Sequence, residues 1–277
     1  MNQQDQVSGK RLRQLIVRAD DMGSSHAANV ACIDCYRRGI VRSVEVMVPC
    51  AWFPEAVILL VENPGLDVGV HLTLTSEWER CKWRSLTRAP SLASCDGFFP
   101  KLIWTNPAFP PGSALLDGPL CPDEIEGEWR AQIEQACRSI PRISHLSAHM
   151  GCTVINADIT AMAKQLAHEY GLMFEVGASE VVSMRGWPAG TPVADQPAAF
   201  IEALSNLPSG ISLFIEHPGL DEAEMQGFGN PTETQVAVQR GAVTRIFTDP
   251  AVMDAVRRAG IELISYADLA SSAFRKA

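Results

Sequence analysis

The sequence predicts an α/β fold built around a mostly parallel sheet. Three observations support it: short apolar runs, amphipathic segments with helix start and stop signals, and their alternation along 277 residues. Such alternation is typical of parallel sheets, whose strands are joined by helices. Six or seven strands in this length fit either a barrel or a doubly wound sheet. The expected strands are residues 14–19, 41–48, 66–74, 142–149, 210–215 and 261–265.

The first strand and helix are indicated by sharp signals. Residues 14–19 (QLIVRA) form a short apolar run that ends in two aspartates. Ser24 or Ser25 can cap the helix that follows, because a serine hydroxyl accepts from the free amides of a first turn. Gly39 can end that helix, and the apolar run 41–48 is expected as the next strand.

The next helix and strand are separated by a clear turn. Residues 53–62 are expected to form a helix that stops before Asn63-Pro64-Gly65. The run 66–74 (LDVGVHLTL) is apolar and β-rich, so it is expected as the third strand.

The second half of the chain contains further helix signals. A helix is expected at 123–139, and residues 158–170 carry the cleanest amphipathic pattern of the chain, closed by Gly171. Asp249-Pro250 is typical of a cap followed by proline at the first helical position, and Gly260 can end that helix.

Residues 76–121 break the alternation, with many Pro and Gly and the tryptophans Trp78, Trp83 and Trp104. A long segment without periodicity in a compact domain is usually functional. We therefore expect an ordered, ligand-facing loop excursion from a single domain at 13–277, which follows a polar tail at 1–12.

Composition excludes several classes of protein. The 32 acidic residues outnumber the 23 basic ones, which leaves a net charge of −9 and argues against a nucleic-acid partner. No apolar run reaches the ~18 residues of a membrane span. The polar amino-terminal segment lacks the apolar centre of a secretion signal, so a cytoplasmic protein is expected.

The eight cysteines are scattered along the chain. Cys32 and Cys35 form a C-x-x-C inside an expected helix, but no second such pair exists to complete a zinc set. Ordinary buried thiols are therefore expected.

Polar residues that can do chemistry gather at strand ends. In parallel α/β folds, ligands bind at the carboxyl ends of the strands. Any one of these residues could be structural, as a cap, turn or core residue, and His26 and His168 are expected to be so. The strand-end residues are Asp20, Asp21, His71, His145, His149 and His217.

Such a set can support metal-assisted hydrolysis. One carboxylate and two imidazoles bind a divalent cation and leave positions open for water and substrate. A second carboxylate can take a proton from the water, and a further imidazole can protonate a leaving amine. Asp20 and Asp21 supply both carboxylate roles, because adjacent residues of a strand point different ways.

The motifs RADDMG, GVHLTLTSEW, SHLSAHMG, IEHPG and RAGIELISYADL, in this order, resemble the YdjC/ChbG family of carbohydrate deacetylases, which act on chitooligosaccharides and polysaccharides. The resemblance covers about residues 15–270. It implies an α/β fold of one irregular (β/α) barrel of the glycoside hydrolase/deacetylase type, with mostly parallel strands. It also implies a metal-dependent hydrolase that releases acetate from an N-acetylated sugar and leaves an amino sugar.

The resemblance also implies roles for individual residues. Asp20 matches the catalytic base, and Asp21, His71 and His149 match the metal ligands. His217 matches a late histidine expected to act as the general acid. Two histidines and one aspartate suit zinc best, although magnesium, manganese, cobalt and nickel also remain open.

Two departures from the family pattern concern residues beside these ligands. Many members carry aspartate where this chain has Ser147, and a serine orients a neighbouring histidine ligand more weakly. Met150 begins a Met-Gly-Cys stretch where chitooligosaccharide-type members often have a histidine-rich run. Met150 and Trp78 are expected to contact the sugar, with Trp83 as an alternative stacking residue and packing as the alternative role for both tryptophans.

Two other functions fit the same strand-end residues. A metal-dependent sugar isomerase or aldolase would need a further base, for which Glu216 is the main candidate. A non-catalytic sugar-binding protein could keep the fold without the chemistry. The expected partner is a small carbohydrate, and a homodimer is compatible with a barrel of this kind.

Overall fold

The computed structural model describes residues 12–174 and 181–269. The expected polar tail at 1–12 lies outside the described residues, apart from Leu12. Within the described ranges, no helix combines the length and the apolar character that a membrane crossing requires.

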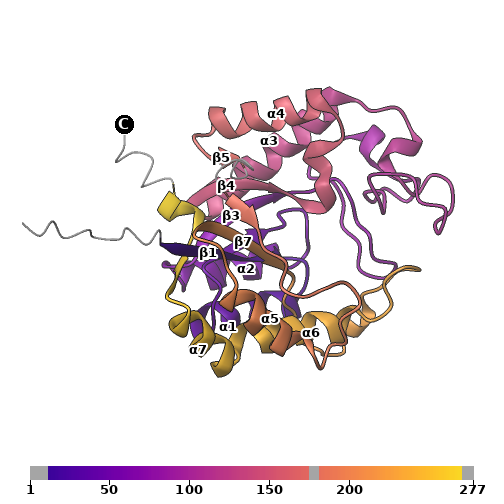
Figure 1. The fold of residues 1–277 in the computed structure, drawn as a ribbon. Helices are drawn as coiled ribbons and strands as arrows, with labels where there is room; N and C mark the ends of the chain where they lie inside the picture. The colour runs from indigo at the N-terminus through magenta and orange to yellow at the C-terminus, as the bar shows by residue number, and fades with distance from the viewer. Residues whose placement is uncertain (1–11, 175–180, 270–277) are drawn as a thin grey trace, which may run out of the picture.

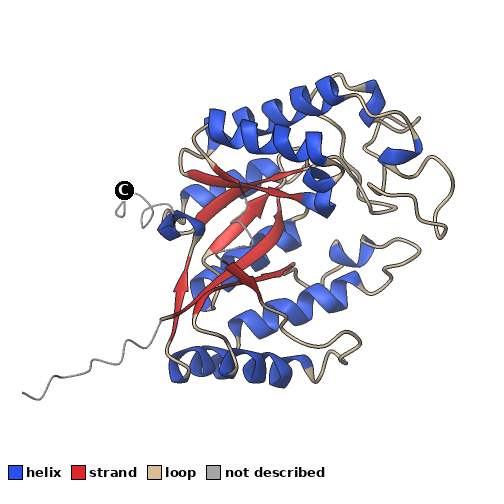
Figure 2. Cartoon of the chain, turned by 45° about the horizontal axis from the view of Figure 1, so that its top comes forward, coloured by secondary structure: helices blue, strands red, loops and turns tan. Residues whose placement is uncertain are grey.

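One curved parallel sheet organises the described chain (Figures 1 and 2). Its strands follow the order β5-β4-β3-β2-β1-β7-β6, and β8 pairs with β1. Every pairing is parallel, so the chain has the expected α/β fold, curled as an open barrel. The strands are β1 (Arg13–Met22), β2 (Ser43–Val46), β3 (Asp67–Leu72), β4 (Ile143–Ala148), β5 (Met173–Phe174), β6 (Val181–Ser183), β7 (Gly210–Glu216) and β8 (Ile261–Ile264).

The expectation of six or seven strands was too low, because eight are present in the described part of the chain. The strands not foreseen are β5 and β6, which have only two and three residues. Runs this short carry no measurable alternation, so they give no strand signal in the sequence.

Helices cover both faces of the sheet (Figure 1). In that view α3 and α4 lie above it, and α1, α5, α6 and α7 lie below. The helices are α1 (His26–Arg38), α2 (Phe53–Val61), α3 (Pro122–Ser139), α4 (Ala157–Glu169), α5 (Gln196–Ser205), α6 (Val236–Thr248) and α7 (Pro250–Arg258).

Side-chain caps mark the start of some of the helices that the sequence predicts. The side chain of Ser25 accepts from the amide of Ala28 at the start of α1, and Asp249 caps α7 in the same way. No side chain caps α5 or α6. Helices α5 and α6 were not predicted from the sequence, but a missing cap is not the whole reason, because α2 and α3 also lack a capping side chain and were expected.

Strand β1 is the hub of the sheet. It pairs with β7 along one edge, from Arg13–Gly210 to Ala19–Glu216. Strand β8 pairs with the first half of β1. Strand β2 pairs with its second half. The expected strand 14–19 would have placed Asp20 and Asp21 after its end. The strand continues to Met22, so both aspartates lie inside β1.

The excursion at residues 76–121 is ordered and packed. It contains two short 3₁₀ turns, Pro90–Leu92 and Leu115–Asp117, and an isolated pairing of Leu102 with Ala114. Trp83 and Phe99 from this segment are buried in the main apolar core. The segment is thus an ordered excursion, as expected for a loop that contains several tryptophans.

The cysteines behave as ordinary thiols. Cys32 and Cys35 are free and buried in α1. Burial raises the pKa of both thiols, which keeps them protonated. Their burial as free thiols agrees with the ordinary buried cysteines expected from the sequence.

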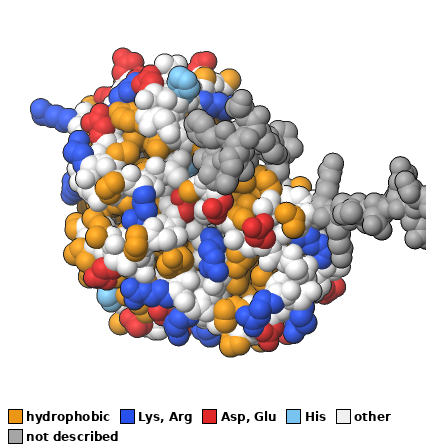
Figure 3. All heavy atoms as spheres, turned by 90° about the vertical axis from the view of Figure 1, so that its left-hand side faces the viewer, with side chains coloured by type: hydrophobic (Ala, Val, Ile, Leu, Met, Phe, Trp, Pro, Cys, Tyr) orange, Lys and Arg blue, Asp and Glu red, His pale blue; other side chains and the backbone are white. Residues whose placement is uncertain are grey.

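The face from which β1 starts mixes its charges. Figure 3 shows Lys and Arg side chains interspersed with Asp and Glu among apolar ones on this face. The polar residues that carry chemistry lie at the opposite ends of the strands.

Candidate metal centre

A cavity of about 420 Å³ lies at the carboxyl ends of the central strands. Its walls come from β1, β3, β4 and β7, from the residues that follow β3, and from α6. This is the edge at which parallel α/β folds bind ligands. Among its lining residues are Asp20, Asp21, His71, His149 and His217, which the sequence had placed at strand ends.

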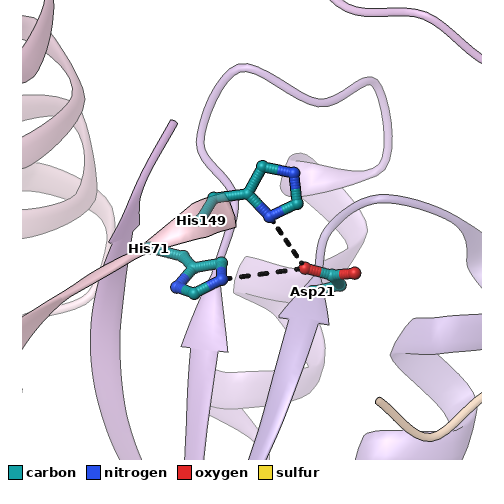
Figure 4. Close-up of side chains that lie close together, drawn as sticks. All are labelled: Asp21, His71 and His149. Carbon is teal, nitrogen blue, oxygen red and sulfur yellow. Dashed lines mark ion pairs between the residues drawn. The ribbon is translucent and has the colours of Figure 1, made fainter. Parts of the chain in front are cut away.

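Asp21, His71 and His149 come together at the floor of this cavity (Figure 4). Asp21 Oδ1 lies 3.3 Å from Nδ1 of His149 and 3.8 Å from Nε2 of His71. One donor atom from each of the three buried side chains lies within 4.8 Å of the other two. Two imidazole nitrogens and one carboxylate oxygen are a donor set that divalent metals accept.

One carboxylate oxygen of Asp21 indicates whether a cation fits between the three side chains. Asp21 Oδ1 is buried and has no hydrogen-bond partner in the described part of the chain. A buried carboxylate oxygen without a partner is costly. A cation between this oxygen and the two imidazoles would satisfy it, so the residues fit a metal ion.

A β-bulge brings both aspartates to the cavity. Between the pairings Ala19–Val44 and Met22–Val46, Asp20 and Asp21 of β1 oppose the single residue Glu45 of β2. Asp21 has φ 68°, a left-handed conformation. In a regular strand, neighbouring side chains point to opposite faces; the bulge re-aims one of them, so both line one cavity.

His149 is placed by a similar irregularity at the end of β4. The expected strand 142–149 stops at Ala148, and His149 begins a 3₁₀ turn. Met150 then adopts φ 48°. Asp21 and Met150 are the two non-glycine residues with positive φ within the described ranges, and both line the cavity.

Arg240 of α6 holds the second oxygen of Asp21. Its Nη2 lies 2.6 Å from Asp21 Oδ2. Burial alone would raise the pKa of Asp21, but the Arg240 guanidinium and nearby histidines lower it well below its usual range. The carboxylate is therefore ionised, as a metal ligand must be.

Glu77 flanks His149 on its other side. Glu77 Oε2 lies 3.0 Å from Nε2 of His149, which leaves Nδ1 facing Asp21. Burial lowers the pKa of His149, but the carboxylates of Glu77 and Asp21 raise it by more, to about 10. This ring would have to lose a proton before it could bind a metal.

His71 presents its Nε2 to the cavity floor. Its Nδ1 lies 2.7 Å from Ser147 Oγ, which fixes the orientation of the ring. Burial and the neighbouring His149 ring lower the pKa of His71 well below its usual range. The neutral imidazole that results is the form that coordinates a metal.

Asp20 is held by Arg18, two residues earlier on β1. The guanidinium donates from Nε to Asp20 Oδ1 at 2.7 Å and from Nη2 to Oδ2 at 2.9 Å. Asp20 Oδ2 also lies 3.6 Å from Nε2 of His71. Asp20 is thus fixed beside the three candidate ligands.

His217 lies on the cavity wall, with 42% of its side chain exposed. Loss of solvent lowers its pKa, but the carboxylates of Asp21 and of Glu216, which lies 3.9 Å from its Nδ1, raise the pKa by more, so it lies above the usual value. A partly exposed imidazole with this balance can hold a proton near neutral pH.

The expected sugar-contact residues have different surroundings. Trp78 lines the cavity but is only 2% exposed, because it packs against Phe228 and the Arg240 guanidinium. Met150 also lines the cavity. The indole N–H of Trp83 donates to the backbone carbonyl of Thr75 at 2.6 Å, so its polar edge is used inside the loop.

Four charged residues of the site were not singled out from the sequence. Glu77 lies in the aperiodic loop, and Arg240 lies on a helix that the sequence did not predict. Arg18 and Glu45 did leave a signal, since each is a lone charge inside an apolar strand run. A charge at such a position is rarely buried without a partner.

The remaining histidines stand apart from the cavity walls. His145 is buried against Glu45, at 2.5 Å from its Nε2 to Glu45 Oε1. His26 contacts Glu55 on the surface, and His168 is exposed on α4. The structural roles expected for His26 and His168 agree with these positions.

A second cavity of about 580 Å³ continues the first. The two share Glu216, Gln239 and Val243 as lining residues. The second cavity extends to Arg185 and Trp187, which precede α5. The two cavities are therefore adjacent, with the three shared side chains between them.

Known proteins with similar sequences include several carbohydrate deacetylases. "Carbohydrate deacetylase 2" of Listeria innocua is 32% identical over 57% of this chain and 58% of its own length, so the match spans less than two thirds of that relative. "Carbohydrate deacetylase" of Thermus thermophilus is 28% identical over 79% of this chain and 81% of its own. "Chitooligosaccharide deacetylase" of Yersinia enterocolitica is 27% identical over 92% and 98%.

The fold and the family both have matches that span most of the chain. A solved structure from Enterococcus faecalis, provisionally assigned to cellobiose-phosphate cleavage, superimposes with a TM-score of 0.74. It covers 93% of this chain and 99% of its own at 22% identity, which establishes a common fold. The model of the YdjC-like protein family matches residues 14–258, and the chain therefore belongs to that family.

Proposed function

We propose that this protein removes the acetyl group from an N-acetylated sugar with the help of one divalent metal ion. The carrying observation is the buried Asp21 Oδ1, which accepts no hydrogen bond and faces the ring nitrogens of His71 and His149. The relatives named carbohydrate deacetylases support the reaction class.

The donor set favours zinc among the candidate metals. Zinc accepts imidazole nitrogen and carboxylate oxygen in sites that keep a position open for substrate. Magnesium and calcium prefer shells made of oxygen alone. Cobalt, nickel and manganese accept the same donors and are the natural substitutes to test.

Asp21, His71 and His149 would hold the ion, and Arg240 would keep Asp21 Oδ1 free by holding Oδ2. A bound divalent ion would acidify a water molecule and polarise the acetyl carbonyl. The chain's own residues then supply the proton transfers.

Asp20 is assigned as the general base. It accepts a proton from the attacking water while the water oxygen bonds to the acetyl carbon. Arg18 keeps both carboxylate oxygens in place during this step. His217 donates a proton to the sugar nitrogen as the carbon–nitrogen bond breaks, which releases acetate and the free amine.

The two adjacent cavities suggest where the sugar lies. The acetylated ring would occupy the first cavity, against Trp78 and Met150. Any further part of the carbohydrate would extend past Gln239 towards Arg185 in the second cavity. This arrangement favours substrates that carry more than one sugar unit.

Acetate release tests the proposal. Metal-stripped protein, and the same protein with zinc, cobalt, nickel, manganese or magnesium restored, would be assayed on single and linked N-acetylated sugars. We expect acetate in amounts equal to free amine, and only with metal. Sugar isomerisation without acetate would reject deacetylation in favour of an isomerase, for which Glu216 in the cavity wall is the available base.

A further inference from the structure

Glu45 is a fully buried carboxylate in the middle of β2, beneath the proposed metal ligands. One oxygen accepts from Nε2 of His145 at 2.5 Å, and the other accepts from the hydroxyl of Ser147. Both donors come from β4, two residues apart. Glu45 is opposite the bulge that carries Asp20 and Asp21.

Ser147 connects Glu45 to His71. A serine hydroxyl has one proton, and Ser147 donates it to Glu45 Oε2. Ser147 Oγ must therefore accept from Nδ1–H of His71, which lies 2.7 Å away. This places the ring proton on Nδ1 and leaves the Nε2 lone pair facing Asp21 Oδ1.

Strand β3 leaves room for the Glu45 carboxylate at Gly69. A Cβ at Gly69 would lie 2.3 Å from Glu45 Oε2 and 2.5 Å from His145 Nε2. Only a glycine leaves room at that point of β3, two residues before His71. Burial would raise the pKa of Glu45, but His145 and Arg18 lower it below its usual value, so the carboxylate is charged.

We propose that Glu45 is a positioning residue that acts through Ser147 to fix the tautomer and orientation of His71, and so raises the affinity of the site for its metal. The inference rests on the proposed function for the identity of the ligands. In many metal sites a carboxylate accepts directly from the ligand histidine. Here the Ser147 hydroxyl of β4 lies between the His71 ring of β3 and the Glu45 carboxylate of β2.

Metal affinity is the deciding measurement. Zinc and cobalt dissociation constants of the full chain would be measured by chelator competition for the parent, Ser147→Ala and Glu45→Gln. We expect Ser147→Ala to weaken binding about 10- to 100-fold, the usual effect of losing such a partner, and Glu45→Gln to weaken it in the same direction. The visible absorption of the cobalt form should change with both.

Ser212→Ala is the matched control. Ser212 is another buried serine in a central strand, and its Oγ has no hydrogen-bond partner among the described residues. Its metal affinity should equal that of the parent. Thermal melts of each metal-free variant would separate a loss of metal affinity from a loss of stability.

Moving the charge gives a second test. In Glu45→Ala, His71 loses the distant carboxylate, and adding Ser147→Asp supplies a direct one. The double variant should bind zinc more tightly than Glu45→Ala alone, and no gain would contradict the relay. This coupling between neighbours is measured by the double-mutant cycle.

The outcomes separate this inference from the proposed function. Parental zinc affinity in a folded Ser147→Ala overturns the relay, even if the parent releases acetate. Weakened affinity without acetate release from any sugar keeps the relay and rejects deacetylation. A parent protein that binds neither ion rejects both.

Discussion

Asp21 and Met150 adopt backbone conformations that residues other than glycine rarely adopt. The left-handed region costs roughly 1–2 kcal/mol for a residue with a side chain. Both residues line the cavity that holds the candidate ligands. Strain of this kind persists where the surrounding structure enforces it, commonly at functional sites. Here it brings the Asp21 carboxylate and the His149 ring to one point.

Replacing Asp20 tests its proposed role as the general base. Asp20→Asn should lower kcat by about 10²–10⁴, the usual contribution of a general base, because an amide cannot accept the proton from water. Asp20 is not one of the three ligands, so the zinc dissociation constant should stay close to that of the parent. Both values would be measured on the same preparation. Full turnover by Asp20→Asn would reject Asp20 as the base.

The raised pKa of His149 predicts how the stability of the metal-free protein depends on pH. Its pKa is raised from 6.5 to about 10 by Glu77 and Asp21, against the effect of burial. A raised pKa stabilises the folded state below the unfolded value, and the gain is lost as pH rises through the folded value. The free energy of unfolding should fall between about pH 6.5 and 10, by at most about 1.4 kcal/mol per pH unit.

Urea unfolding at pH 6, 8 and 10 in the presence of a chelator would measure this dependence. His149→Gln cannot take up the proton and should lack that part of the fall. Identical pH dependence in both proteins would contradict the assignment.

At the scale of secondary-structure elements, the sequence predicted those with a start signal or a clear period. Strand β1 was foreseen from QLIVRA, and α1 from its Ser25 cap. Helix α6 was missed, because it begins with neither a capping side chain nor a proline, and Arg240 was missed with it. The bulge in β1 was also beyond prediction, since it depends on the register with β2 and not on local residue types.

Two glycines give opposite predictions at this scale. Gly127 lies exposed within α3, and a Cβ there meets nothing within 4 Å. Gly127→Ala should therefore stabilise the protein by about 0.5–1 kcal/mol, since glycine weakens a helix interior. Gly69→Ala in β3 would meet Glu45 and His145 and should destabilise it by about 1–3 kcal/mol.

Denaturant unfolding of the two variants beside the parent measures both effects. Equal stability of Gly69→Ala and the parent would show that Glu45 and His145 can move apart. That result would also weaken the case for a rigid Glu45 relay.

At the scale of the whole molecule, the rule that ligands bind at the carboxyl ends of parallel strands predicted that five residues would lie together. Asp20, Asp21, His71, His149 and His217 all line one cavity, as parallel topology requires. The partners of these residues could not be predicted in the same way. Contacts such as Arg240 with Asp21, 219 residues apart, arise only when the whole sheet has formed.

The thiols report on the integrity of the whole fold. Cys95 is exposed and should react quickly with a maleimide, whereas the buried thiols should react only at the rate of unfolding. Burial raises the pKa of Cys32, Cys35 and Cys50, which slows them further. Mass spectrometry of timed samples would assign each site, and labelling of Cys32 as fast as Cys95 would contradict the described core. The buried thiols are Cys32, Cys35, Cys50 and Cys152.

The position of β1 in the sheet has a consequence for how the protein is made. Among the described strands β1 leaves the ribosome first, yet its partners β7 and β8 leave last. Contacts between such distant segments form slowly, because the intervening chain must first be closed into a loop. Asp20 and Asp21 therefore stay without their final neighbours until β7 and β8 have been made. The proposed metal site is then completed only after the later strands have joined the sheet, although Asp21 is made with β1.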